Sequence, residues 1–206
     1  ALSAAFVFDI DTVNGSGGDS LAFVVATSKT LPGAENGQFL GLLSTRNNGN
    51  FSNHLFAIEF DTVKAIGPFA DIDENHVGVD VNSLQSNVAK AAAYYANSGK
   101  KVSVELLSAQ PNQAYNGGTS ILYVTIAPLP LPRPRRPLMS HAIDLSPILR
   151  NICTLDSPPQ PEISQATNIS WVGASARMAS RRGSIHLSCP FPQGKSKHHQ
   201  HQELVD

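Results

Sequence analysis

Residues 54–83, HLFAIEFDTVKAIGPFADIDENHVGVDVNS, decide both the fold class and the candidate function of this chain. Glu59 and Asp61 stand two apart in an apolar run, and side chains at i and i+2 of a strand point to the same face. Two neighbouring carboxylates on an apolar strand repel each other and lose hydration, and a divalent cation removes both costs. Asp71 and His76 follow a short loop later. This set suits a borderline transition ion such as Mn²⁺, with oxygens left for a neighbouring Ca²⁺.

The acidic pair also has a plainer interpretation. Glu59 and Asp61 could be ordinary solvent-facing strand residues, and only the downstream Asp71 and His76 favour a metal site over that alternative.

The composition is typical of one globular domain. The chain has 206 residues, of which 41% are hydrophobic and 15% charged, so it is neither of the disordered nor of the membrane class. The net charge of −1 predicts no nucleic-acid partner. No apolar run is long enough to span a bilayer, so we expect no direct membrane span in this chain. Cys153 and Cys189 could pair in an oxidising compartment, but two cysteines are not a disulfide framework.

Up to about residue 127 the pattern predicts an all-β fold. Short apolar or alternating runs are separated by Gly, Asn and Pro clusters, as strands and turns require. The runs are AAFVFDID (4–11), LAFVVA (21–26), FLGLL (39–43), HLFAIEFDT (54–62), HVGVDV (76–81), VSVELL (102–107) and SILYVTIA (120–127). NGG at 116–118 indicates a hairpin turn, and AKAAAYY at 89–95 has a helix-forming composition but is too short for a domain element. Many short strands without helices favour a sandwich or jelly roll.

The character changes after about residue 150. The segments SPPQPEISQATN (157–168), ARMASRRGS (176–184) and CPFPQGKSKHHQHQ (189–202) lack strand periodicity. Their composition predicts an atypical, largely unstructured tail over residues 151–206.

Several segments resemble one known family. AIEFDT (57–62) followed by DIDENHVGVDVNSL (71–84) is similar to the metal-binding hairpin of legume-type (L-type) lectins, in particular the ectodomains of plant lectin receptor kinases. SLAFVVATSKTLPGA (20–34) and ILYVTIAPLPLPRPRRPLMS (121–140) fall in family order. The resemblance implies a concanavalin-like β-sandwich (jelly roll), truncated at both ends, with residues 1–150 as an incomplete lectin-like domain. It also makes LPLPRPRRPLMS (129–140) a connector to the next strand rather than a polyproline ligand.

The resemblance implies a role for each ligand of the metal hairpin. Glu59 would bind the transition ion alone, Asp61 and Asp71 would each bridge both ions, and His76 would complete the Mn²⁺ set. The backbone carbonyl of Val63 would face Ca²⁺. The implied cofactors are therefore Mn²⁺ and Ca²⁺.

A carbohydrate site is implied beside the metals. Asp19 would accept hydrogen bonds from two sugar hydroxyls, the loop at Gly37 would supply a backbone N–H, and Phe69 is a candidate stacking ring. Ser86 lies where the family holds a metal-bound water. Ala65 stands where the family has an asparagine that serves both Ca²⁺ and the sugar, so we expect both interactions to be weakened, by about 1–3 kcal/mol.

The function expected from the resemblance is metal-dependent, non-catalytic binding of glycans or glycoproteins at an extracellular or cell-surface location reached by the secretory pathway, with a homo-dimer as a further expectation. A sugar-inactive sensing or interaction domain derived from a lectin receptor kinase ectodomain is the alternative, which Ala65 favours. An enzyme is not expected: related sandwich glycoside hydrolases carry an ExDxE strand, and Val63 stands here in the third acidic position.

Overall fold

The computed structural model describes residues 2–10, 20–26, 31, 33–65, 67, 69–108, 110–118, 120–148, 169–172, 176–178 and 185–187. The strands are β1 Leu2–Ile10, β2 Leu21–Ala26, β3 Leu55–Asp61, β4 His76–Val81, β5 Val88–Ala91, β6 Ala93–Tyr95, β7 Lys101–Ser103, β8 Asn112–Gly118, β9 Ile121–Pro128, β10 Met139–Ala142, β11 Ile169–Val172, β12 Ala176–Met178 and β13 Ile185–Leu187. Two 3-10 helices, η1 Gly37–Phe39 and η2 Phe51–Asn53, lie between β2 and β3. No helix within the described ranges has the length and apolar character needed to cross a membrane.

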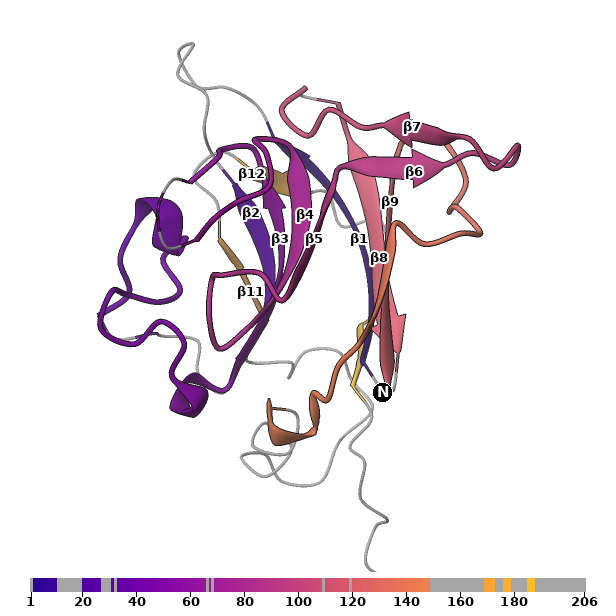
Figure 1. Cartoon of the computed structure of the whole chain (residues 1–206). Helices are drawn as coiled ribbons and strands as arrows, with labels where there is room; N and C mark the ends of the chain where they lie inside the picture. Colours follow the sequence, from indigo (N-terminus) through magenta and orange to yellow (C-terminus); the bar gives the residue numbers. More distant parts are fainter. Residues whose placement is uncertain are drawn as a thin grey trace, which may run out of the picture.

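Two antiparallel sheets pack face to face (Figure 1). The first has the strand order β11-β2-β3-β4-β5, and the second has β10-β9-β8-β1-β12 with β13 also paired to β1. Strands β6 and β7 form a separate hairpin that projects beside the second sheet. The predicted all-β sandwich is therefore confirmed.

The main core fills the space between the sheets. Because side chains alternate along a strand, Phe56, Ile58 and Phe60 of β3 all point into this space. The ring of Phe60 meets that of Phe8 from β1, with the centroids 4.5 Å apart. Burying one such side chain stabilises the fold by about 1.5–3 kcal/mol.

A second, smaller core lies on the other face of the first sheet. There Val24 of β2 and Ala57 of β3 pack against Phe39, Leu42 and Leu43 from the segment that carries η1 and η2. In Figure 1 this segment covers the side of β2 and β3 that faces away from the second sheet. Alternate residues of β3, Glu59 and Asp61 among them, therefore point into a layer between sheet and loop rather than into solvent.

Three parts of the chain differ from the sequence expectation. FLGLL (39–43) is no strand: η1 ends there and turns follow, with Leu40 and Gly41 at positive φ, which strands do not adopt. AKAAAYY (89–95) contributes to β5 and β6, because both segments pair with neighbouring strands. The NGG sequence at 116–118 lies within β8, so the hairpin turn to β9 comes just after it.

The predicted tail also contains strands. Residues 169–172 form β11, which continues the first sheet and places Trp171 opposite Phe23 of β2, and β12 and β13 pair with β1. Backbone pairing with existing strand edges supplies the structure that the sequence pattern did not indicate. The rest of 151–206, with Cys153 and Cys189, lies outside the described residues.

Candidate metal centre

A row of polar side chains crosses the loop-covered face of the first sheet. The β3–β4 register pairs Asp61 with His76 and Glu59 with Gly78. Ser20, immediately before β2, is close enough for its Oγ to donate to Asp61 Oδ1 at 2.6 Å. The hairpin geometry alone thus places both carboxylates of β3 beside the imidazole of β4.

Both carboxylates of β3 are buried. The exposed fraction is 3% for Glu59 and 8% for Asp61, which excludes the alternative that they are ordinary solvent-facing residues. The backbone N–H of Val63 donates to Asp61 Oδ1 at 2.7 Å, and the hydroxyl of Ser86 donates to Glu59 Oε1 at 2.6 Å. Buried carboxylates require such compensation, because an unpaired buried charge is strongly destabilising.

Asp71 reaches the row from the loop between β3 and β4. Its Oδ2 accepts a hydrogen bond of 2.7 Å from the backbone N–H of Ala65. One ligand atom each from Asp61, Asp71 and His76 lies within 4.8 Å of the other two. That spacing brings two oxygens and one nitrogen close enough to share a single cation.

The imidazole of His76 is oriented by the backbone. Its Nδ1 lies 2.8 Å from the carbonyl oxygen of Asp73, and because a carbonyl only accepts, Nδ1 donates. In the neutral ring the lone pair is then on Nε2, which is buried, has no hydrogen-bond partner among the described residues and lies 3.5 Å from Glu59 Oε1. A metal-binding histidine needs this arrangement, with one nitrogen held by an acceptor and the other directed at the ion.

Electrostatics indicate that the cluster holds protons when no cation is present. Burial alone would lower the pKa of His76, but Glu59, Asp61 and the Asp73 carbonyl outweigh it and raise that pKa to about 9. Burial raises the pKa of Asp61 and of Asp71, although hydrogen bonds from Ser20 and Val63 to Asp61, and from Ala65 to Asp71, oppose the effect. A bound cation would displace these protons, because metal ligands must be deprotonated.

Gly78 makes room for the cluster. An added Cβ would lie 2.1 Å from Glu59 Oε1 and 2.2 Å from the Oγ of Ser86, far inside any van der Waals contact. Only glycine at the centre of β4 allows the Glu59 carboxylate to cross over the strand. The carboxylate therefore occupies the place of a side chain, within reach of His76.

Asp80 is a buried member of the cluster that the sequence interpretation missed. It is fully buried, its Oδ1 lies 2.8 Å from the Ser86 Oγ, whose single proton the Asp80 and Glu59 carboxyl groups share, and its Oδ2 has no hydrogen-bond partner within the described part of the chain. Burial, and next the charge of Glu59, raise the pKa of Asp80 well above its ordinary value. The available signal was the period-two spacing of His76, Gly78 and Asp80, which puts all three on one face of the strand.

Of the residues predicted for the sugar site, the structure describes Gly37 and Phe69. Gly37 is exposed at the start of η1. Val63, predicted to face Ca²⁺ through its carbonyl, is 39% exposed, and its N–H bonds to Asp61. Phe69 is only 4% exposed, and its ring packs edge-on against Phe39 with the centroids 5.1 Å apart. The expectation that Phe69 offers a stacking face is therefore corrected, because both faces of a core ring are covered by protein. Asp19 lies outside the described residues.

Comparison with known proteins identifies the family. The model of the legume lectin domain matches residues 2–155. This chain belongs to the legume lectin domain family. The L-type lectin-domain containing receptor kinase V.9 of Arabidopsis thaliana is 44% identical over 154 residues, which cover 72% of this chain and 23% of the relative. The receptor kinase SIT2 of Oryza sativa subsp. japonica is 36% identical over 213 residues, covering 96% of this chain and 31% of the relative.

The chain corresponds to one part of each of these relatives. The chain spans about a quarter to a third of the length of the curated relatives it matches, and the matched relatives are named as receptor kinases with a lectin domain. Among solved structures, lectin UEA-II complexed with galactose superposes with a TM-score of 0.53 at 22% identity, covering 91% of this chain and 65% of that one. At that identity the superposition supports the shared sandwich fold alone.

Proposed function

We propose that this legume lectin domain binds carbohydrate without catalysing a reaction, and that binding depends on divalent cations held by Glu59, Asp61, Asp71 and His76. The observation that carries the proposal is the buried cluster in which ligand atoms of Asp61, Asp71 and His76 lie within 4.8 Å of one another, with the Nε2 of His76 free of hydrogen bonds from the described residues. Carboxylate oxygens with one imidazole nitrogen suit Mn²⁺, and further oxygens of Asp61 and Asp71 suit Ca²⁺.

In this proposal the protein residues shape and order the binding loop. The bound cations supply fixed positive charge and screen the buried carboxylates from one another. Asp71 accepts from the N–H of Ala65 and so links two parts of the same loop, and Asp61, at the end of β3, accepts from the N–H of Val63 at the start of that loop. Metal bound to both carboxylates would hold the loop between β3 and β4 in one conformation. We propose that Val63 contributes its backbone carbonyl and that Asp19 and the Gly37 loop contact the sugar.

The expected partners are glycans or glycoproteins at an extracellular or cell-surface location, as for receptor ectodomains, and a homo-dimer is part of the proposal. The lack of a third acidic residue at Val63, which leaves the two-carboxylate mechanism of glycoside hydrolysis without an acid/base, supports a non-catalytic role.

Two observations favour a second candidate function, a sensing or interaction domain that no longer binds sugar. Ala65 offers only its backbone N–H, which is used by Asp71, and no side-chain ligand. Phe69 offers no ring face. Retained metal binding without sugar recognition is the signature of this alternative.

One experiment separates the two candidates. The metal-stripped, folded protein is titrated calorimetrically with Mn²⁺ and then with Ca²⁺, and the apo and loaded forms are screened against a glycan array. Uptake of both ions with glycan binding only in the loaded form supports a lectin. Metal uptake with no glycan signal supports the sugar-inactive domain, and folded protein that binds neither ion contradicts the metal assignment.

A further inference from the structure

The charges of this chain are distributed unevenly. Residues 1–80 contain ten acidic and three basic side chains, whereas residues 81–143 contain one acidic and six basic ones. The overall net charge of −1 hides this asymmetry. Divalent cations in the proposed metal centre would neutralise part of the acidic half and leave the basic half unchanged, so the basic part would dominate the field of the loaded protein.

Most of these basic side chains gather on two neighbouring segments. Lys100 and Lys101 lie on the β6–β7 hairpin, and Arg133, Arg135 and Arg136 lie on the connector between β9 and β10; together they form the basic surface. All five are exposed. The guanidinium carbon of Arg136 lies 3.9 Å from the ring centroid of Tyr95, the residue that pairs with Lys101, which joins the two segments.

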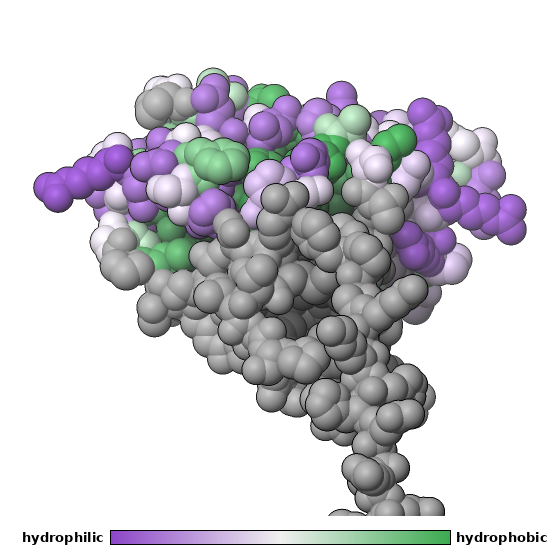
Figure 2. Space-filling model, turned by 90° about the horizontal axis from the view of Figure 1, so that it is seen from below, coloured by the Kyte–Doolittle hydropathy of each residue, from purple (hydrophilic) through white to green (hydrophobic). Residues whose placement is uncertain are grey.

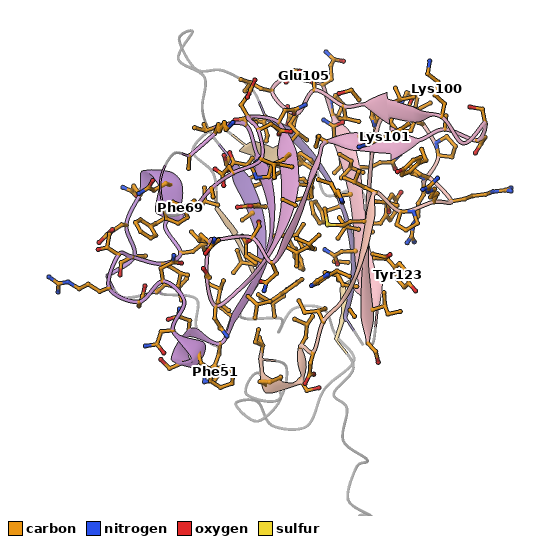
Figure 3. All side chains as sticks on the ribbon, viewed as in Figure 1. Phe51, Phe69, Lys100, Lys101, Glu105 and Tyr123 are labelled. Carbon is orange, nitrogen blue, oxygen red and sulfur yellow. The ribbon has the colours of Figure 1, made fainter. Side chains whose placement is uncertain are left out.

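Different segments carry the basic surface and the candidate metal centre. In Figure 3, Lys100 and Lys101 lie on the side of the β6–β7 hairpin, and Phe69, whose loop carries Asp71, lies to the left. Seen from below, hydrophilic residues also gather at the right edge, on the side of the hairpin and connector (Figure 2). None of the five basic side chains is among the residues assigned to the metal centre.

The connector that displays the arginines is fixed in place. The N–H groups of Leu129 and Leu138 donate to the carbonyls of Pro111 and Val124, each at 2.9 Å, and the Gln113 side-chain amide donates to the Leu131 carbonyl. Arg133 lies 4.7 Å from the ring centroid of Tyr115. Two guanidinium groups are thus held over aromatic rings, which lowers the entropy lost when they bind an anion.

Among the described residues, no carboxylate forms an ion pair with this surface. Within the described ranges, none of the five side chains has a carboxylate oxygen within 4.0 Å, and the ion pairs that do occur there involve His76. Along the sequence, Glu105 is the one acidic residue between Asp80 and Asp144. Five exposed cations repel one another, and an anionic partner would remove that repulsion.

The surroundings narrow the class of partner. Single-stranded nucleic acid stacks on open aromatic faces, but Arg136 covers one face of Tyr95 and Arg133 covers one face of Tyr115. A bilayer interface favours a broad apolar face, whereas the connector exposes two leucines, Leu129 and Leu131, each 39% exposed and beside three arginines. A polymer that carries regularly spaced carboxylates on polar rings fits best, because the arginine fork matches a carboxylate with two parallel hydrogen bonds.

We propose that the basic surface is a second binding region that takes a carboxylate-bearing acidic polysaccharide, independently of divalent metal. This inference rests on the proposed function only in placing the domain among glycan-binding proteins. Its interaction is expected to weaken with added salt, because the contacts are exposed.

The test uses the full chain and immobilised polygalacturonate in 50 mM NaCl with a chelator, with fully methyl-esterified polymer as the neutral probe. The variant Lys101→Gln/Arg135→Gln should bind the acidic polymer about 2- to 30-fold more weakly, as expected for the loss of two exposed ion pairs. The matched control, Arg46→Gln/Lys90→Gln, removes the same charge from exposed positions outside the basic surface and should bind normally. Neither pair touches the residues assigned to the metal centre.

Three results would overturn the proposal: no binding to polygalacturonate in the chelator, equal binding to the esterified polymer, or equal loss in both variants. Tighter binding to a single-stranded oligonucleotide or to phosphatidylserine vesicles than to the acidic polymer would refute the stated partner class. Because the assay contains a chelator, failure of the metal-dependent lectin function would leave this result unchanged, and the reverse also holds.

Discussion

Replacing Gly78 by alanine adds one carbon atom, the Cβ, and should disrupt the candidate metal centre. The new Cβ would lie 2.1 Å from Glu59 Oε1, whereas an ordinary contact begins near 3.4 Å, so one of the two must move by more than 1 Å. The backbone of β4 is held between β3 and β5, which leaves the Glu59 carboxylate as the group that moves. Its bond to Ser86 would break, and its oxygen would leave the side of His76.

The expected loss in the free energy of unfolding has two parts. Overpacking a buried site destabilises a protein by about 1–3 kcal/mol, and losing a hydrogen bond to a charged group costs about 1.5–3 kcal/mol. The sum, about 2.5–6 kcal/mol, is comparable to the whole stability of many domains. We therefore expect the Gly78→Ala protein to be folded only under mild conditions. The affinity of the folded variant for Mn²⁺ should fall at least tenfold.

Urea unfolding with and without Mn²⁺, together with calorimetric titration, measures both effects. The control Val79→Ile adds one methylene to the opposite face of the same strand, inside the core between the sheets, and should lower stability without lowering Mn²⁺ affinity. Adding Glu59→Asp to Gly78→Ala shortens the side chain that carries the carboxylate. This second change should recover part of the lost stability, which a double-mutant cycle would measure. Normal Mn²⁺ affinity in folded Gly78→Ala protein would show that Mn²⁺ binding does not require the Glu59 carboxylate to lie over Gly78.

Three further outcomes are expected. Phe69→Ala should lower the free energy of unfolding by about 3–5 kcal/mol because the ring is part of the second core; a normal urea midpoint with weakened sugar binding would instead restore Phe69 as a stacking platform. Ala65→Asn should strengthen Ca²⁺ and sugar binding together, by about 5- to 150-fold if it supplies one missing polar partner. Ala65→Ser, with a shorter side chain, should not. If calorimetry shows no gain for Ala65→Asn, Ala65 does not stand at the asparagine position of the family. The pKa of His76 is raised from 6.5 to about 9, so its contribution to stability is complete below pH 6.5 and is lost as the pH rises through 9. The melting temperature of the metal-free protein should fall across that window, while Mn²⁺ affinity should rise; a melting temperature that does not fall would contradict the pKa of His76.

The metal hairpin was the most predictable part of the molecule. The spacing of Glu59 and Asp61 placed them on one face, and the apolar runs on both sides predicted the paired strands β3 and β4. Their burial was not predictable, because an acidic pair on a strand looks the same from the sequence whether it faces solvent or a covering loop. The loop that buries them is held by Phe39 and Leu42, whose segment has the apolar pattern of a strand.

Tertiary contacts determine the environments of Asp80 and Phe69, which the sequence left open. Asp80 looked like the polar face of an alternating strand, but the β3–β4 register places it diagonally across from Glu59 on the face that the loop buries, with the Ser86 hydroxyl near both carboxyl groups. Phe69 looked like an exposed loop aromatic beside Asp71, but the second core needs a ring at that point. In both residues the local pattern was compatible with two environments, and packing against a distant segment selected one.

Asp61, Asp71 and His76 together are proposed to hold a metal ion. A crystal structure of the protein loaded with Mn²⁺, with anomalous difference data collected above the manganese edge, tests it most directly. If the ion binds there, an anomalous peak should lie within bonding distance of His76 Nε2 and of carboxylate oxygens from Asp61 and Asp71. Ordered density for these three side chains with no peak between them, or a peak elsewhere on the chain, would contradict it.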